Sequence, residues 1–141
     1  MAWLVIFSGY TRELTSSGFN DRVAECWQAA AALTPNGQIL SDVSEAEYEA
    51  NRDRLPADLQ RRAAHFFTER KRVEQGKALW SVGDYQGFGD LMNRSCQSSI
   101  NQYECGSDPL IKLHEIASQT AGVLGSRFSG GGYGGLSLIH I

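Results

Sequence analysis

The sequence has little cysteine, and its few cysteines are widely spaced. It contains 3 cysteines, Cys26, Cys96 and Cys105, and no Cys-x-x-Cys pair. Zinc sites and disulfide frameworks need paired or closely spaced cysteines, so neither is predicted. A reducing cytoplasm is therefore the expected location, and Cys26 and Cys96 are expected in the core because they lie on apolar helix stripes.

The sequence also lacks an excess of basic residues and any long apolar run. The 13 basic and 16 acidic residues give a formal net charge of −3. Nucleic-acid-binding proteins usually carry a basic excess, so no nucleic-acid partner is expected. The basic residues between Arg61 and Arg72 are interleaved with Glu69, and we interpret them as a solvated helix face rather than a phosphate-binding patch. The apolar segment 3–7 is too short to cross a bilayer, so no membrane partner is expected.

Hydrophobic periodicity predicts an opening strand, a series of helices and two closing strands. Residues 3–8 are a short apolar run that ends at Ser8-Gly9, which favours a buried strand. Apolar residues at three- and four-residue steps predict four helices. Their ranges are 17–33, 56–82, 84–102 and 108–120. The capping-box pattern Ser-Glu-Ala-Glu at 44–47 predicts a further short helix, and Asp84 is expected to cap the helix 84–102. Residues 122–128 are expected to form a second strand and residues 136–141 a third.

This order of elements predicts a single α+β domain of the ferredoxin-like type, with the helices packed on a small antiparallel sheet. On the first helix, the residues expected on one buried face are Phe19, Val23, Cys26, Trp27, Ala30 and Leu33. On the helix 56–82, apolar residues recur every seven positions and predict one buried stripe along its whole length. Those residues are Leu59, Phe66, Val73 and Trp80.

The glycine-rich turn between the two closing strands is the segment that most favours a ligand-binding site. Its residues Ser129, Gly130, Gly131 and Gly132 combine a hydroxyl with backbone N–H groups that can approach an anion without side-chain hindrance. A tight hairpin turn with no ligand is the alternative.

Arg127, just before the turn, is a candidate for bidentate contact with a phosphate or carboxylate. Its alternatives are exposure on a strand face or pairing with a helix carboxylate. His65 and His114 have no partner at metal-ligand spacing, so we interpret both as structural and predict no metal site.

Three segments, in order and spacing, resemble the galactokinase branch of the GHMP sugar kinases. The first is Leu-Thr-Ser-Ser-Gly-Phe-Asn-Asp-Arg at 14–22 with Glu25-Cys26. The second is Gly-Asp-Tyr-Gln-Gly-Phe-Gly-Asp-Leu-Met at 83–92 with Ser95, Ser98-Ser99 and Tyr103-Glu104. The third is Gly-Val-Leu-Gly-Ser-Arg-Phe-Ser-Gly-Gly-Gly-Tyr-Gly-Gly at 122–135. The resemblance runs from Leu4 to Gly135. Residues 98–111 are more similar to galacturonokinases, and the glycine run is more similar to galactokinases.

The resemblance implies that residues 1–135 form the C-terminal domain of a GHMP kinase. The implied activity is transfer of the γ-phosphate of ATP, with Mg²⁺, to the anomeric hydroxyl of galactose, galacturonate or arabinose in the cytoplasm. It also implies that the loop 129–132 lies beside the phosphate-binding loop and the sugar. Phe19 takes the position of a sugar-contacting tyrosine of many galactokinases, keeping the stacking surface without the hydroxyl. Core packing is the alternative for Phe19.

Several motifs of these kinases are absent from the sequence. It has no Gly-Glu-His-Thr-Asp segment, no Pro-x-Gly-x-Gly-Leu-Ser-Ser-Ser loop, no Walker-type substitute and no aspartate in the context of the family's catalytic one. We therefore expect a fragment that is inactive alone, with ATP and Mg²⁺ held mainly outside it. Residues 136–141 are expected to be a non-native tail without functional weight. The alternatives are a non-catalytic regulator that binds sugar and nucleotide, or an interaction module.

Overall fold

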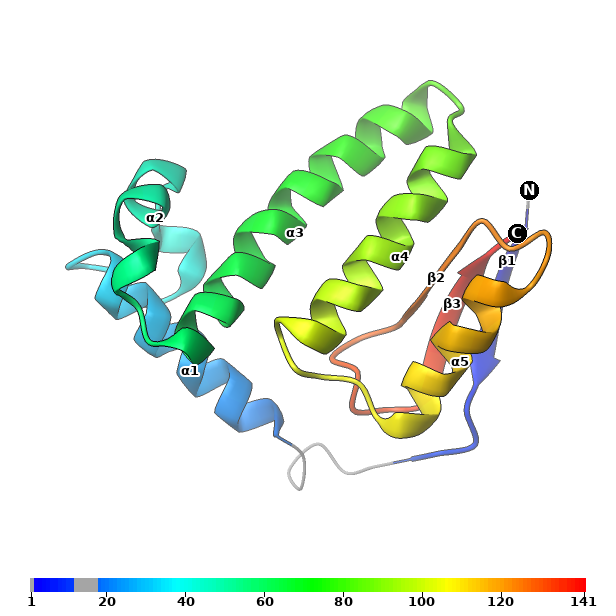
Figure 1. Ribbon diagram of the computed structural model, residues 1–141, viewed down its shortest axis with the longest axis horizontal. Coiled ribbons are helices and arrows are strands. Elements are labelled where there is room, and N and C mark those ends of the chain that lie inside the picture. The colour runs from blue at the N-terminus through cyan, green and yellow to red at the C-terminus, as the bar shows by residue number, and fades with distance from the viewer. Residues whose placement is uncertain (1, 12–17) are drawn as a thin grey trace.

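The computed structural model describes residues 2–11 and 18–141, which form an α+β fold (Figure 1). The helices are α1 (Phe19–Leu33), α2 (Glu45–Asn51), α3 (Ala57–Ser81), α4 (Tyr85–Asn101) and α5 (Asp108–Gln119), with short 3-10 turns η2 (Leu40–Asp42) and η3 (Arg52–Arg54). The strands are β1 (Trp3–Phe7), β2 (Gly125–Phe128) and β3 (Leu136–His140). The predicted elements and their order are confirmed, although β2 begins later than predicted because residues 120–124 form a turn. The prediction that the first strand is buried is wrong, because β1 lies at the edge of the sheet, where Val5 is 60% and Phe7 55% exposed.

Part of the first resemblance segment, Leu14 to Ser17, lies outside the described residues, and so does the predicted helix start at residue 17. Within the described part of the chain, no helix combines the length and apolarity that a membrane crossing requires.

The local start signals read from the sequence are present in the structure. The Ser44 side chain accepts a hydrogen bond from the backbone N–H of Glu47, whose carboxylate accepts one from the Ser44 N–H at 2.9 Å. Asp84 caps α4 by accepting from the Gly87 N–H at 2.9 Å. These contacts satisfy backbone N–H groups that have no partner within the helix.

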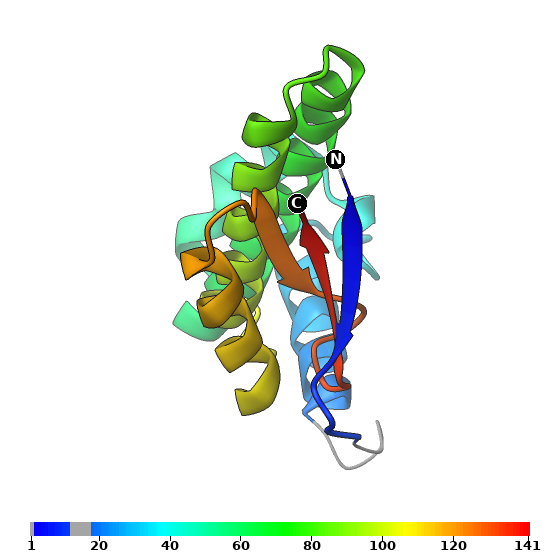
Figure 2. The ribbon, with the colours of Figure 1, turned by 90° about the vertical axis from the view of Figure 1, so that its right-hand side faces the viewer.

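The sheet is antiparallel with strand order β1-β3-β2, so the last segment of the sequence supplies its central strand. Paired residues share a face of the sheet. Figure 2 shows the three strands side by side, with β3 between β2 and β1. Arg127 and its partner Leu138 face α3 and α4, whereas Ser126 and its partner Ile139 face α5. Residues 136–140 are thus part of the fold, and the non-native origin of this tail stays a prediction.

Two apolar clusters form the core. The first joins α1, α2 and the first half of α3, and its members include Ala30, Leu33, Tyr48, Ala63 and Phe67. The second joins α4, α5, β2 and the loop after β2 through Cys96, Cys105, Leu110, Phe128 and Tyr133. The long antiparallel pair α3 and α4 connects the two clusters (Figure 1).

The predicted apolar stripes are only partly buried. On α3, Leu59 is buried, but Val73 is 53% and Trp80 38% exposed. On α1, Trp27 is 56% exposed. The prediction of a buried stripe is wrong for Val73 and Trp80, because α1 and α2 cover only the first half of α3. The second half of α3 instead borders an apolar cavity of about 470 Å³, whose lining also includes Trp3. The prediction is also wrong for Trp27, which borders a separate open cavity.

Close backbone contact holds α4 against the start of β2. A Cβ at Gly89 would lie 2.3 Å from the carbonyl oxygen of Leu124, and a Cβ at Gly125 would lie 2.2 Å from the carbonyl oxygen of Gly89. These distances are far below van der Waals contact, so only glycine fits at either position. The contact between Gly89 and Gly125 therefore fixes the position of β2 along α4, and with it the position of the loop that follows β2.

Candidate functional site

The glycine loop, residues 129–135, connects β2 to β3. Gly130 and Gly132 have φ of 70° and 79°, in the left-handed region that favours glycine. The Ser129 N–H donates to the Leu136 carbonyl at 2.8 Å and closes the turn. The Gly132 carbonyl accepts from the Ser107 N–H at 2.9 Å, which ties the loop to the start of α5. The loop is therefore held at both ends by backbone hydrogen bonds.

Phe19, at the first position of α1, lies against this loop. Its ring meets that of Tyr133 edge to face, with centroids 6.3 Å apart and an interplanar angle of 86°. A Cβ at Gly131 would lie 3.6 Å from Phe19 Cδ2. Phe19 is 38% exposed, so it is not a plain core residue. The structure thus brings the first and third resemblance segments together, as a shared substrate side would require.

Tyr133 is a residue of this site that the sequence reasoning did not single out. It is 9% exposed, and burial raises the pKa of its phenol. Its hydroxyl lies 3.7 Å from the position that a Cβ would take on Gly18, at the start of α1. One signal was available in the sequence, because an aromatic residue inside a glycine run has no role in making a turn.

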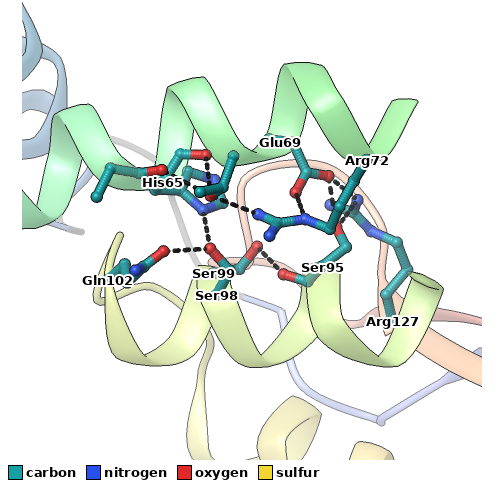
Figure 3. A network of polar contacts seen from close by, with 10 residues as sticks. His65, Glu69, Arg72, Ser95, Ser98, Ser99, Gln102 and Arg127 are labelled. Atoms are coloured by element: carbon teal, nitrogen blue, oxygen red, sulfur yellow. Dashed lines mark hydrogen bonds and ion pairs between the residues drawn. The ribbon is translucent and has the colours of Figure 1, made fainter. Parts of the chain in front are cut away.

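Arg127 points away from the loop, toward α3 and α4 (Figure 3). Its Nη1 donates to Ser95 Oγ at 2.6 Å and to Glu69 Oε1 at 3.2 Å, while Arg72 Nε donates to Glu69 Oε2 at 2.7 Å. Burial alone would raise the pKa of Glu69, but hydrogen bonds from Ser95 and Arg72 and the two arginine charges lower it. These contacts match the alternative of a helix carboxylate partner. The predicted anion contact of Arg127 stays a prediction, and an anion would have to compete with Glu69.

The two helix histidines make contacts within the fold. His65 Nδ1 lies 2.8 Å from Ser98 Oγ (Figure 3), and His114 Nδ1 lies 2.7 Å from Ser126 Oγ. Burial lowers the pKa of His65 to about 4 and lowers that of His114, so both are neutral at pH 7. Within residues 2–11 and 18–141, no group of three or more His, Cys, Asp or Glu side chains is placed to hold a metal ion.

A buried ion-pair network holds α1, and with it Phe19, in place. Arg62 is 1% exposed, and it donates to Glu25 Oε2 at 2.5 Å and Glu104 Oε2 at 2.6 Å. Arg22 contacts the same two carboxylates at 3.1 and 3.2 Å. The interpretation of the basic run as a solvated face is wrong for Arg62, because α1 and the segment between α4 and α5 cover that side of α3.

The chain is similar to sugar kinases over nearly its whole length. It is 42% identical over 145 residues to a galacturonokinase from Arabidopsis thaliana, and the match covers 98% of this chain and 34% of that protein. It is 37% identical over 141 residues to a galactokinase from Roseiflexus sp. (strain RS-1), covering 98% of this chain and 36% of that protein. No protein-family model matches the chain.

The fold is also that of a solved sugar kinase. The crystal structure of Lactococcus lactis galactokinase complexed with galactose matches with a TM-score of 0.87 and 32% sequence identity, covering 97% of this chain and 36% of that chain. The predicted resemblance and the predicted α+β class are confirmed, and the matched part is the C-terminal region of a galactokinase-like protein. The chain spans about a third of the length of the curated relatives it matches.

Proposed function

We propose that this chain is the C-terminal part of an ATP-dependent sugar 1-kinase, and that it supplies the wall formed by Phe19 and the glycine loop to the sugar and phosphate side of the active site. The substrate class is galactose, galacturonate or arabinose. The observation that carries the proposal is the contact between Phe19 and the loop, which joins the two segments that resemblance assigns to the substrate side.

The loop is suited to binding an anion next to a sugar. Phosphoryl transfer depends on positioning and charge stabilisation more than on covalent chemistry by the protein. The fixed backbone of Gly130 to Gly132 brings N–H groups close to a phosphate without Cβ atoms in the way, and Ser129 adds a hydroxyl. Phe19 offers a partly exposed ring to the apolar face of a sugar.

ATP and Mg²⁺ are assigned mainly to the rest of the kinase. The resemblance implies that the Mg²⁺ ligands of these kinases lie mainly outside this chain. ATP supplies the transferred phosphoryl group, and this chain's own contribution is to position the sugar and limit water beside it. We place the protein in the cytoplasm, which agrees with the three free cysteines.

A chimera tests this proposal. The chain would replace the matching C-terminal region of Lactococcus lactis galactokinase, and a coupled assay would measure ADP release with galactose, galacturonate and arabinose. We expect ADP release that depends on one of these sugars, and none from either part alone. A chimera that melts cooperatively but releases no ADP with any of the sugars would contradict the proposal.

A non-catalytic regulator that binds sugar and nucleotide is the second candidate, because Phe19 lacks the hydroxyl of the sugar-contacting tyrosine that the resemblance implies at this position. A folded chimera that binds sugar and ATP by calorimetry, without ADP release, would favour this candidate. A folded chimera that binds neither would favour an interaction module.

A further inference from the structure

We infer that Tyr133 is a sugar-contacting residue, whose hydroxyl forms a hydrogen bond with a substrate hydroxyl beside the ring of Phe19. This inference rests on the proposed function, and it adds a specificity-determining residue to the same site. Three observations carry it: the anchoring of the Tyr133 ring, the position of its hydroxyl and the surface that surrounds that hydroxyl.

The ring of Tyr133 is held by the core. It belongs to the apolar cluster that contains Cys105, Leu110 and Phe128. Its backbone follows Gly132, whose carbonyl is bonded to the start of α5 and whose added Cβ would lie 2.6 Å from Phe128 Cε2. The direction of the side chain is therefore fixed before any ligand binds, which lowers the entropic cost of a contact.

The hydroxyl of Tyr133 emerges from this core at the start of α1. It lies 3.7 Å from the Cβ position of Gly18, which is ordinary contact distance. A buried tyrosine hydroxyl normally has a hydrogen-bond partner. Among the hydrogen bonds between residues 2–11 and 18–141, none involves the Tyr133 hydroxyl. Within the described part of the chain, the direction of this hydroxyl is therefore set by the packing of its ring rather than by a hydrogen bond.

The surface around the hydroxyl has the chemistry of a sugar site. A sugar ring presents C–H groups on one face and hydroxyls at its rim, so its sites combine an aromatic ring with a few convergent polar groups. Here the partly exposed ring of Phe19 lies edge to face with Tyr133. Asp21 Oδ2 lies 3.9 Å from the same Cβ position of Gly18. The Tyr133 hydroxyl and the Asp21 carboxylate therefore lie near one point beside Gly18, and the ring of Phe19 packs against the ring of Tyr133.

The test is removal of the hydroxyl in the active chimera. Tyr133→Phe keeps the ring and is expected to raise KM for the sugar about tenfold, the size of one hydrogen bond, while KM for ATP stays within about twofold. Tyr48→Phe is the matched control. It removes the hydroxyl of a buried tyrosine on α2, in the other apolar cluster, and it should leave KM for the sugar unchanged.

A double variant transfers the hydroxyl from the ring of residue 133 to the ring of residue 19. Phe19→Tyr combined with Tyr133→Phe is expected to recover part of the lost sugar affinity, measured by calorimetry as well as by KM. For a monodeoxy sugar that lacks the contacted hydroxyl, Tyr133→Phe should have no further effect. Unchanged sugar KM and unchanged calorimetric affinity in Tyr133→Phe would overturn the inference. An inactive parent chimera would instead count against the proposed function.

Discussion

The close contact between α4 and β2 predicts opposite outcomes for two glycine substitutions. In Gly89→Ala the new Cβ would lie 2.3 Å from the Leu124 carbonyl oxygen, about 1 Å short of ordinary contact, and the obstacle is backbone rather than a movable side chain. Overpacking of this kind costs about 1–3 kcal/mol and outweighs the gain of up to about 1 kcal/mol from alanine in a helix. We expect the melting temperature of the 141-residue chain to fall by roughly 5 °C.

Gly76→Ala in α3 is the matched control. Its Cβ would lie 3.4 Å from Phe88 Cε2, which is ordinary contact with a side chain. The helix preference for alanine then dominates, and we expect a stabilisation of about 0.5–1 kcal/mol. Thermal and urea unfolding followed by circular dichroism measure both variants. Equal shifts, or a more stable Gly89→Ala, would refute the account of how α4 packs on β2.

Three further predictions concern the pH dependence of stability, a substitution at His140 in the central strand β3, and the activity of the isolated chain. Burial lowers the folded-state pKa of all three histidines, so the unfolded chain takes up protons first and stability falls as the pH drops from about 6.5 toward 4. His65, with a folded pKa of about 4, contributes a loss on the order of 3 kcal/mol, and a flat profile of urea midpoints over this range would contradict it. His140 is fully buried and neither ring nitrogen has a partner among the described residues, so His140→Leu should stabilise the chain by about 1–3 kcal/mol. An unchanged or lower melting temperature would show that the imidazole is accommodated. The isolated chain should release no ADP with galactose, galacturonate or arabinose, and turnover at an ordinary enzyme rate would refute the fragment interpretation.

Local sequence signals predicted the elements well. The capping box at Ser44 and the cap at Asp84 act within one turn of the chain, so their partners could be read directly from the sequence. Burial along a helix depends on what covers it. The stripe on α3 continues to Trp80, but the covering helices end earlier, and no local pattern reveals where that cover stops.

The candidate site could be predicted only in part, because most of its contacts join residues that are distant in the sequence. The resemblance implied that Phe19 and the glycine loop both lie beside the sugar, and the structure brings these two segments into contact. The partners of Arg127 and Arg62 lie far away in the sequence, so the carboxylates of Glu69 and Glu104 could not be assigned to them. Tyr133 was missed because the sequence signal, an aromatic residue within a glycine run, does not show that Tyr133 lies against Phe19.

The most direct test of the central claim is a valine at the middle of the glycine loop in the chimeric kinase. Gly131 is not at positive φ, and its Cβ would meet Tyr133 and Phe19 at 3.5 and 3.6 Å, so Gly131→Val is tolerated by the fold while its methyl groups enter the space beside the two rings. Gly134→Val, where a Cβ would meet open space, is the control within the same loop. The account predicts that Gly131→Val shifts the melting temperature by only a few degrees and lowers kcat/KM at least about tenfold, while Gly134→Val changes neither. Unchanged kinetics in Gly131→Val would show that the loop is only a hairpin turn and would contradict its place on the substrate side.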